Sequence, residues 1–280
     1  MRSSPVPGER LPRRMPGNGN RAVERPPLLF GMKFPHYSYP LRLFPGLFFG
    51  LLTGRHRSFR DDALVCIVGL NPPMRVLGET NIPGSGPCVL TMNHYYRPGF
   101  GAWWIALAIA AAVPQELHWV MTAEWTFPGR WYGFLGRPLL RWVLKRAAGM
   151  YGFTSMPPMP PRPSDIVKRS LSVRTVLDYI HHHPGSMLAV SPEGGDAPGG
   201  ILAWPPSGAG RFLLLLAGAG YSIVPVGCWE QEGALCLRFG QAYRLEVLGG
   251  AAKERDNAAA SIVMQAIASQ LPYELRGKFL

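Results

Sequence analysis

The sequence predicts a single α/β domain with a largely parallel, buried sheet flanked by helices, preceded by a basic N-terminal segment. Two observations predict this fold. Short apolar stretches with the length of buried strands alternate with stretches of helical spacing from residue 61 onward. Most of the net charge of +12 lies before that point, since residues 1–60 hold 11 Lys and Arg against 2 Asp and Glu, and residues 61–280 hold 18 against 15. The chain therefore consists of a basic front and a nearly neutral body.

The basic front divides again by composition. Residues 1–30 are rich in Pro, Gly and Arg and hold no long apolar run, so we expect a disordered basic tail and no secretory signal peptide. Residues 31–60 contain the apolar stretch Leu43–Thr53, framed by basic residues. This stretch is shorter than the roughly 18–20 residues that cross a bilayer. We expect an amphipathic segment that lies in a membrane interface, with a helix packed on the body as the alternative.

Strands in the body, residues 61–280, are indicated by apolar runs that end in turn residues. In chain order they are Ala63–Leu70, Pro87–Asn93, Leu117–Glu124, Ser186–Gly195 (which runs into a glycine-rich turn), Ser222–Trp229 and Ala234–Val247. The last range is expected to hold one or two strands, paired as a hairpin. The four cysteines fall in these stretches without metal-ligand spacing, so we expect small apolar side chains in a reducing compartment.

Helices in the body are indicated by apolar residues at three- and four-residue spacing and by capping residues. They are expected over Gly101–Val113, over Gly133–Tyr151, from the cap Ser164 to Pro184, from Ser207 to about Gly220, and over Glu254–Leu271. Met156–Pro163 is too rich in proline for a helix or a central strand. Strands and helices in this order are typical of a parallel sheet buried on both faces.

Two polar clusters follow strands, at the edge where the sites of open α/β sheets gather. Asn93–Gly99 (NHYYRPG) follows one apolar strand, and Ser191–Asp196 (SPEGGD) follows another. A histidine placed as His94 is can serve as a general base, or it can bond a loop carbonyl. Glu193 lies between a proline and two glycines, either in a loop whose N–H groups approach a ligand or in an ordinary turn with an exposed acid. These residues alone leave both questions open.

Together with the strand sequence Val224-Pro225-Val226-Gly227, the two clusters resemble the glycerolipid acyltransferase family, of which 1-acylglycerol-3-phosphate acyltransferase is the best-known member. That family carries Asn-His-x4-Asp, then a Phe-Pro-Glu-Gly-Thr-like motif, then a Val-Pro-Val-like strand. The three motifs occur here in that order, with 98 residues from His94 to Pro192 and 32 from Glu193 to Pro225. The resemblance covers roughly residues 61–280.

The resemblance implies an O-acyltransferase of phospholipid biosynthesis. It would move a fatty acyl group from a thioester, acyl-CoA or acyl carrier protein, to a hydroxyl of a lysophospholipid or related lipid. His94 would be the general base, with Glu193 and Asp196 as further catalytic candidates. A positioned base and a held thioester suffice, so no metal or bound cofactor is expected. Candidate substrate-binding residues are Asn93, Arg97, Pro192, Gly194, Gly195 and Pro225.

The expected partners are the lipid acceptor, the acyl thioester and an anionic membrane surface. With the basic front as an electrostatic tether, we expect a peripheral protein on the cytoplasmic face of a membrane. The charge pattern indicates no nucleic-acid partner, because the body is nearly neutral. His181-His182-His183 closes an expected helix, where cations suit the carbonyl end, so we interpret it as a cap and not a metal site.

The chain departs from the family pattern at three places. Gly99 stands where the family has the Asp that orients the imidazole, and in serine hydrolases the loss of such a group lowers turnover about 10⁴-fold. Glu193, Asp196 or a backbone carbonyl would have to take its place. The family's arginine-containing motif has no clear match, with Arg162 only a loose substitute. Ser207 stands about where family members often carry a lysine.

These departures leave two alternatives to an enzyme. The first is a catalytically inactive relative on the same fold, which would bind lipid without transferring an acyl group. The second is a basic module that binds nucleic acid through residues 1–60. A carboxylate within hydrogen-bond reach of the His94 ring favours the enzyme over the inactive relative.

Overall fold

One sheet positions every candidate residue that the structure describes. The computed structural model describes residues 34–124, 133–158, 162–195 and 197–279, and within these ranges seven strands pair in the order β1-β7-β6-β2-β5-β3-β4. Five strands run parallel: β2 (Cys88–Met92), β3 (Leu117–Thr122), β4 (Thr154–Met156), β5 (Met187–Val190) and β6 (Ser222–Gln231). β7 (Ala234–Phe239) pairs antiparallel to β6, and β1 (Arg75–Leu77) pairs parallel to β7. The largely parallel sheet confirms the predicted α/β fold.

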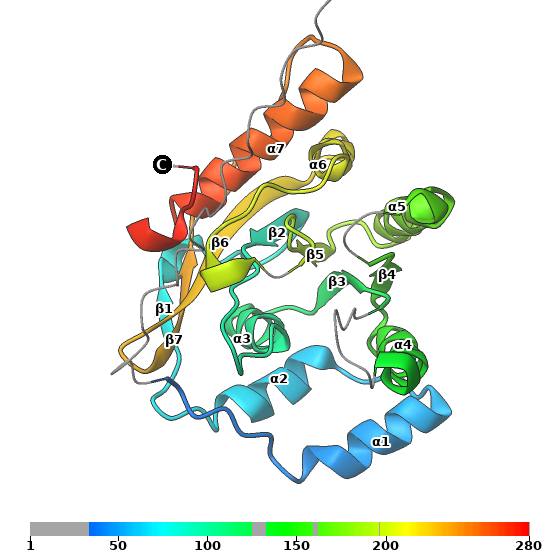
Figure 1. Cartoon of the computed structure of the whole chain (residues 1–280), viewed down its shortest axis with the longest axis vertical. Helices are drawn as coiled ribbons and strands as arrows, with labels where there is room; N and C mark the ends of the chain where they lie inside the picture. Colours follow the sequence, from blue (N-terminus) through cyan, green and yellow to red (C-terminus); the bar gives the residue numbers. More distant parts are fainter. Residues whose placement is uncertain (1–33, 125–132, 159–161, 196, 280) are drawn as a thin grey trace, which may run out of the picture. The chain divides into compact units, whose positions relative to one another are not determined.

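Helices cover both faces of this sheet (Figure 1). α6 (Ala209–Gly218) and α7 (Ala252–Ala268) pack together on one side, with α5 (Ile166–His182) beside them. On the other side α2 (Phe59–Ile67) packs on α3 (Trp103–Ala112), and α1 (Leu43–Thr53) contacts α4 (Gly133–Tyr151). Every residue of β2 and β5 is buried, as expected for strands covered on both faces. Within the described ranges, no helix has the length and apolar character to span a bilayer.

The prediction of a strand over Ala63–Leu70 is wrong, because residues 63–67 lie in helix α2 and residues 68–70 form the turn that ends it. The helix begins after Ser58, whose hydroxyl accepts the N–H of Asp61 at 2.9 Å, and two aspartates occupy its first turn. Both features stabilise a helix start. Ala63 and Cys66 then bury one face of the helix, which packs on α3. The apolar run reads as a strand only when the capping residues before it are overlooked.

Smaller differences concern the ends of elements. Pro163–Asp165 forms a 3-10 turn, and α5 begins at Ile166 without a side-chain cap from Ser164. β1 was not predicted, because a three-residue edge strand leaves little signal in a sequence. The predicted disordered tail, residues 1–30, lies outside the described residues, as do residues 31–33 of the predicted interfacial segment.

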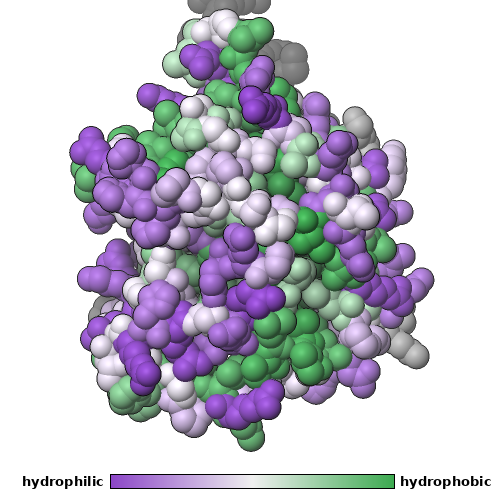
Figure 2. All heavy atoms as spheres, turned by 180° about the vertical axis from the view of Figure 1, so that it is seen from behind, coloured by the Kyte–Doolittle hydropathy of each residue, from purple (hydrophilic) through white to green (hydrophobic). Residues whose placement is uncertain are grey.

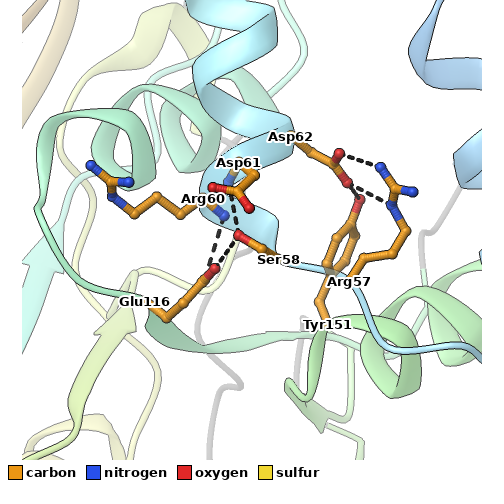
Figure 3. Close-up of polar contacts among 7 residues, drawn as sticks. All are labelled: Arg57, Ser58, Arg60, Asp61, Asp62, Glu116 and Tyr151. Atoms are coloured by element: carbon orange, nitrogen blue, oxygen red, sulfur yellow. Dashed lines mark hydrogen bonds and ion pairs between the residues drawn. The ribbon is translucent and has the colours of Figure 1, made fainter.

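A polar cluster ties α2 to its neighbours (Figure 3). The Asp62 carboxylate is buried and accepts Arg57 Nε at 3.0 Å and the Tyr151 hydroxyl of α4 at 2.8 Å. Ser58 donates to Glu116, which precedes β3. Burial, and after it the hydrogen bond to Asp62 and the charge of that carboxylate, raise the pKa of Tyr151, so this hydroxyl stays protonated. A cavity of about 430 Å³ lies beside this cluster and contains none of the predicted site residues.

Candidate functional site

The register of the sheet brings the two predicted polar clusters to one edge. β2 and β5 pair in parallel with Thr91 opposite Val190, so the segments that follow them leave the sheet side by side. One carboxylate joins these segments. Glu193 Oε2 accepts the backbone N–H of His94 at 2.5 Å, and its Oε1 accepts the backbone N–H of Ala203 at 2.7 Å. The sequence motifs that were predicted to act together are therefore in contact.

Glu193 lies in a tight turn that directs its side chain inward. The N–H of Gly194 donates to the carbonyl of Ser191 at 3.2 Å, with Pro192 second and Gly194 fourth in the turn, as type I turns prefer. Gly194 has φ of +70°, which glycine adopts at little cost. Only 7% of the Glu193 surface is exposed. The interpretation of Glu193 as an exposed acid in an ordinary turn is therefore wrong: the turn is ordinary, but the acid is buried.

His94 begins a loop that is packed on both sides. Its imidazole is half-buried, and its Nδ1 atom is shielded from solvent. The next residue, Tyr95, is buried and packs edge-to-face on Phe100 with ring centroids 5.3 Å apart. A Cβ atom at Gly200 would lie 2.9 Å from the Tyr95 ring, so the backbone of the Ala197–Gly200 turn approaches this loop closely. This packing limits the directions in which the His94 ring points.

Asn93 fixes the start of the same loop to β6. Its side-chain amide donates to the carbonyl of Cys228 at 2.8 Å, and its side-chain oxygen accepts the N–H of Cys228 at 2.7 Å. β2 ends opposite Val226, so this amide continues the ladder two residues further along β6. Asn93 is almost fully buried. Its side chain holds the loop, and a contact between Asn93 and substrate stays a prediction.

Arg97 fixes the middle of the loop to the same strand. Its guanidinium forms a two-point ion pair with the buried carboxylate of Glu230, through Nε and through Nη2 at 2.8 Å. Burial lowers the pKa of Arg97, but the hydrogen bonds and charge of Glu230 outweigh this and raise it overall. Nη1 donates to the carbonyl of Pro98 at 3.0 Å. Arg97 as a substrate-binding residue stays a prediction, since these three nitrogens already contact protein.

The remaining predicted residues differ in how they are placed. Pro192 is buried, Gly194 is exposed and Gly195 is half-exposed on the turn after β5. Pro225 lies buried inside β6, where its carbonyl accepts the N–H of Gly240 at 2.8 Å. The antiparallel pairing shifts by one residue between Val226 and Ile223, and proline suits such a bulge because it has no N–H to donate. Asp196 lies outside the described residues.

Position 99 adopts a backbone conformation that favours glycine. Gly99 has φ of +81° and is exposed in the turn before α3. Few other residues adopt this conformation without strain, although aspartate does so more readily than most. The local backbone therefore explains why glycine is suited to the position where the resembled family has aspartate.

A mostly apolar cavity of about 140 Å³ opens beside the Ser191–Gly194 turn. Its walls come from the carboxyl ends of β3, β4 and β5, from α5 and from the start of α6. They include the apolar residues Met121, Met156, Val173 and Phe212 and the cation Arg169. The Ser191 hydroxyl, which is buried, has no hydrogen-bond partner among the described residues. The cavity thus combines a largely apolar lining with Arg169 and the buried Ser191 hydroxyl, at the edge of the sheet where His94 lies.

Sequence reasoning missed Glu230, which the structure places against the His94 loop. Its carboxylate accepts the Tyr37 hydroxyl at 2.8 Å in addition to Arg97. Burial raises the pKa of Tyr37 and of Tyr95, and the charge of Glu230 raises both further. One signal was present in the sequence: an acid directly after Trp229 in a strand with an apolar core is unusual. Among the described residues, no group of three or more His, Cys, Asp or Glu side chains is placed to hold a metal ion.

Comparison with known proteins gives distant likenesses among solved structures alone. No protein-family model matches the chain, and no curated protein matches it. Among solved structures, the chain is similar to the crystal structure of the 1-acyl-sn-glycerophosphate (LPA) acyltransferase, PlsC, from Thermotoga maritima, with a TM-score of 0.44 and 14% sequence identity over 75% of this chain and 76% of that chain. At this TM-score and identity, the likeness carries no argument about the activity of this chain.

Proposed function

We propose that this protein is a membrane-peripheral O-acyltransferase. It transfers a fatty acyl group from a thioester, acyl-CoA or acyl carrier protein, to a hydroxyl of a lysophospholipid or related lipid. One observation carries the proposal: a buried carboxylate, Glu193, joins the loop of His94 to the turn after β5 at the carboxyl edge of a parallel sheet. Sites of open α/β sheets gather at this edge.

In this proposal His94 is the general base. Its imidazole takes the proton from the acceptor hydroxyl while that oxygen attacks the thioester carbonyl carbon. A new C–O bond forms, the C–S bond breaks, and the proton goes on to the leaving thiolate. Glu193 then acts by holding the backbone of His94, since both of its oxygens accept backbone N–H groups. Asp196, three residues later, stays the second candidate to orient the ring.

The apolar cavity beside the Ser191–Gly194 turn favours a substrate with a hydrocarbon chain. Most of its lining is apolar, including Met121, Met156, Val173 and Phe212, and Arg169 adds a cation to the wall. A thioester held at His94 would have its acyl chain near this cavity, because the turn that borders the cavity is bonded to His94 through Glu193.

The proposed membrane face combines exposed aromatic side chains with basic ones. On α1, Phe44, Phe48, Phe49 and Leu52 are exposed. On α4, which contacts α1, Leu139 and Trp142 are exposed beside the cations Arg141, Lys145 and Arg146. Figure 2 shows on one side of the molecule how exposed apolar side chains gather beside strongly hydrophilic ones. Apolar bulk within a basic frame suits an anionic membrane interface.

We place this membrane contact on the cytoplasmic face. The four cysteines are buried and unpaired, which fits a reducing compartment. Burial raises the pKa of Cys88 to about 11, so its thiol stays protonated and unreactive. The cysteines thus behave as small apolar side chains, as the sequence predicts, although Cys66 lies in a helix and not in a strand.

Acyl transfer is tested with purified full-length protein, a radiolabelled acyl thioester and a panel of lysolipids. We expect product with at least one acceptor, and a loss of about 10³-fold or more in His94→Gln. His181→Gln, on the exposed end of α5, is the matched control and should keep full activity. Thermal unfolding of both variants shows whether they fold. Full activity in His94→Gln would mean that His94 is not the base.

The second candidate is a catalytically inactive lipid-binding relative. Gly99 favours it, because this exposed left-handed position has no side chain that could orient the imidazole. This candidate predicts binding to anionic vesicles and no acyl transfer to any acceptor in the panel. Transfer that depends on His94 would exclude it.

A further inference from the structure

The strongest unassigned feature near His94 is the buried carboxylate of Glu230. Its side chain is 1% exposed, at the end of β6 that extends beyond β2. It accepts Arg97 through two nitrogens and the Tyr37 hydroxyl at 2.8 Å. A charge at this depth is stable only when it is paired and hydrogen-bonded, and Glu230 meets both conditions.

The partners of Glu230 show what it holds. Arg97 lies three residues after His94 in the same loop, and its guanidinium also packs 3.9 Å from the Phe34 ring centroid. Tyr37 lies in the segment before α1 and packs on Phe100, at the far end of the loop, with ring centroids 5.5 Å apart. Glu230 therefore holds two parts of the chain from inside the protein. One is the His94 loop, through Arg97, and the other is the segment of Tyr37, which packs on that loop.

The His94 loop has a second attachment to the same strand, close to Glu230. Asn93, directly before His94, bonds the backbone of Cys228, and Arg97, three residues after His94, bonds the side chain of Glu230. Cys228 and Glu230 are separated by one residue on β6, where pairing with β7 keeps the strand regular. The loop is thus bonded to β6 on both sides of His94, by Asn93 before it and by Arg97 after it.

We infer that Glu230 is a positioning residue, which holds the His94 loop in its working geometry through Arg97. The expected effect on kcat rests on the proposed function, whereas the holding of the loop by Glu230 can be tested without any enzymatic activity. A base displaced by about 1 Å can lose roughly 10²-fold in rate. Glu230 and Arg97 bond each other and not the reacting groups, so the displacement should lower kcat while KM changes little.

The variant Glu230→Gln tests this directly. It keeps the size of the side chain and removes the charge that Arg97 needs. We expect kcat to fall about 10²-fold with KM within about twofold of the wild type. Glu232→Gln is the matched control, two residues further on, because it breaks only the exposed pair with Arg75 and should leave kcat unchanged.

The double variant Arg97→Met/Glu230→Gln separates positioning from stability. Removing both charges avoids the unpaired buried guanidinium, so the melting temperature should return toward the wild type. If Glu230 positions the loop, kcat stays low in the double variant. If kcat recovers together with stability, Glu230 is only structural and the inference is wrong. A rise in KM with kcat unchanged would instead assign Arg97 to substrate binding and would also overturn it.

Hydrogen exchange of the full-length protein decides the loop geometry without any activity. The hydrogen-bonded amides of this loop, which include those of His94 and Phe100, should exchange at least tenfold faster in Glu230→Gln than in the wild type or in Glu232→Gln. Unchanged exchange in this loop would overturn the inference even for an active enzyme. If the wild type transfers no acyl group but the loop loses protection in Glu230→Gln, the proposed function fails and the holding role of Glu230 stands.

Discussion

His118 shows how strongly burial acts on a single titratable side chain of this fold. It is 6% exposed on β3, stacks on Tyr179 with centroids 3.7 Å apart, and bonds Thr154 through Nε2 at 2.8 Å. Burial, and after it the nearby His183, lower its pKa from 6.5 to about 4. His118 is therefore neutral in the folded protein at pH values where the unfolded chain already binds a proton.

This shift predicts a loss of stability in mild acid. Because the unfolded state binds more protons between pH 6.5 and pH 4, the free energy of unfolding should fall by about 2 kcal/mol from pH 7 to pH 5. Urea unfolding at the two pH values measures the difference. His118→Phe keeps an aromatic ring against Tyr179 and should lose most of this pH dependence, whereas His181→Gln should retain it. Equal losses in the wild type and in His118→Phe would show that other groups are responsible.

The candidate site illustrates how few residues set a loop. Near His94, Asn93 and Glu193 each bond backbone groups, and Arg97 bonds the buried carboxylate of Glu230. The sequence predicts a chemical role for each of them, and in the structure each is placed to hold the loop of His94. Polar residues at a strand end are conspicuous in a sequence, but their partners across the sheet are visible only in the fold.

At the scale of elements, α1 exposes four large apolar side chains, Phe44, Phe48, Phe49 and Leu52. Leu43, Leu47 and Leu51 are partly covered, and Phe48 on another side is 66% exposed. The helix is therefore apolar on the side that packs and on the side that faces solvent. This arrangement reconciles the two interpretations of the segment, because one helix can pack on the body and still present aromatic side chains to a membrane.

Phe48→Gln should weaken binding to vesicles of anionic lipid about tenfold. Burying a phenylalanine side chain contributes roughly 1.5–3 kcal/mol, and most of that contribution would be lost. Cosedimentation with vesicles measures the affinity. Val167→Gln, an equally exposed apolar position on α5, is the control and should bind as the wild type does. If both variants bind equally weakly, or if both bind as the wild type does, α1 does not contact the membrane.

Strands could be predicted from the sequence where an apolar run lies in a sheet that is buried on both faces. The apolar stretches around Leu90, Ala189 and Val224 are strands because parallel sheets bury both faces. The segment Ala63–Leu70 is similarly apolar, but residues 63–67 are helical, since Ser58 and the first-turn aspartates decide the start of α2. Apolar runs of eight residues are ambiguous between the two states, and caps outside the run settle the matter.

At the scale of the whole molecule, the edge of the sheet joins residues that are far apart in sequence. His94 meets Glu193 across 99 residues, and Arg97 meets Glu230 across 133. The first contact was predictable, because both residues follow apolar strands of a parallel sheet. The second was not, because it depends on β6 extending beyond β2, and the length by which one strand overshoots another leaves no pattern in the sequence.

The uneven charge of the chain gives the last prediction. Residues 1–60 hold 11 basic and 2 acidic residues, and the cations of α4 lie beside α1. Attraction to anionic lipid through these charges is screened by salt, since the Debye length falls from about 10 Å at 0.1 M to about 3 Å at 1 M. Affinity for anionic vesicles should therefore fall at least tenfold over this range, while binding to neutral vesicles, carried by the aromatic side chains, changes little. Affinity that is independent of salt would mean that the basic front does not tether the protein. If salt instead releases nucleic acid from the full chain while vesicle binding is unaffected, the basic front serves a nucleic-acid partner.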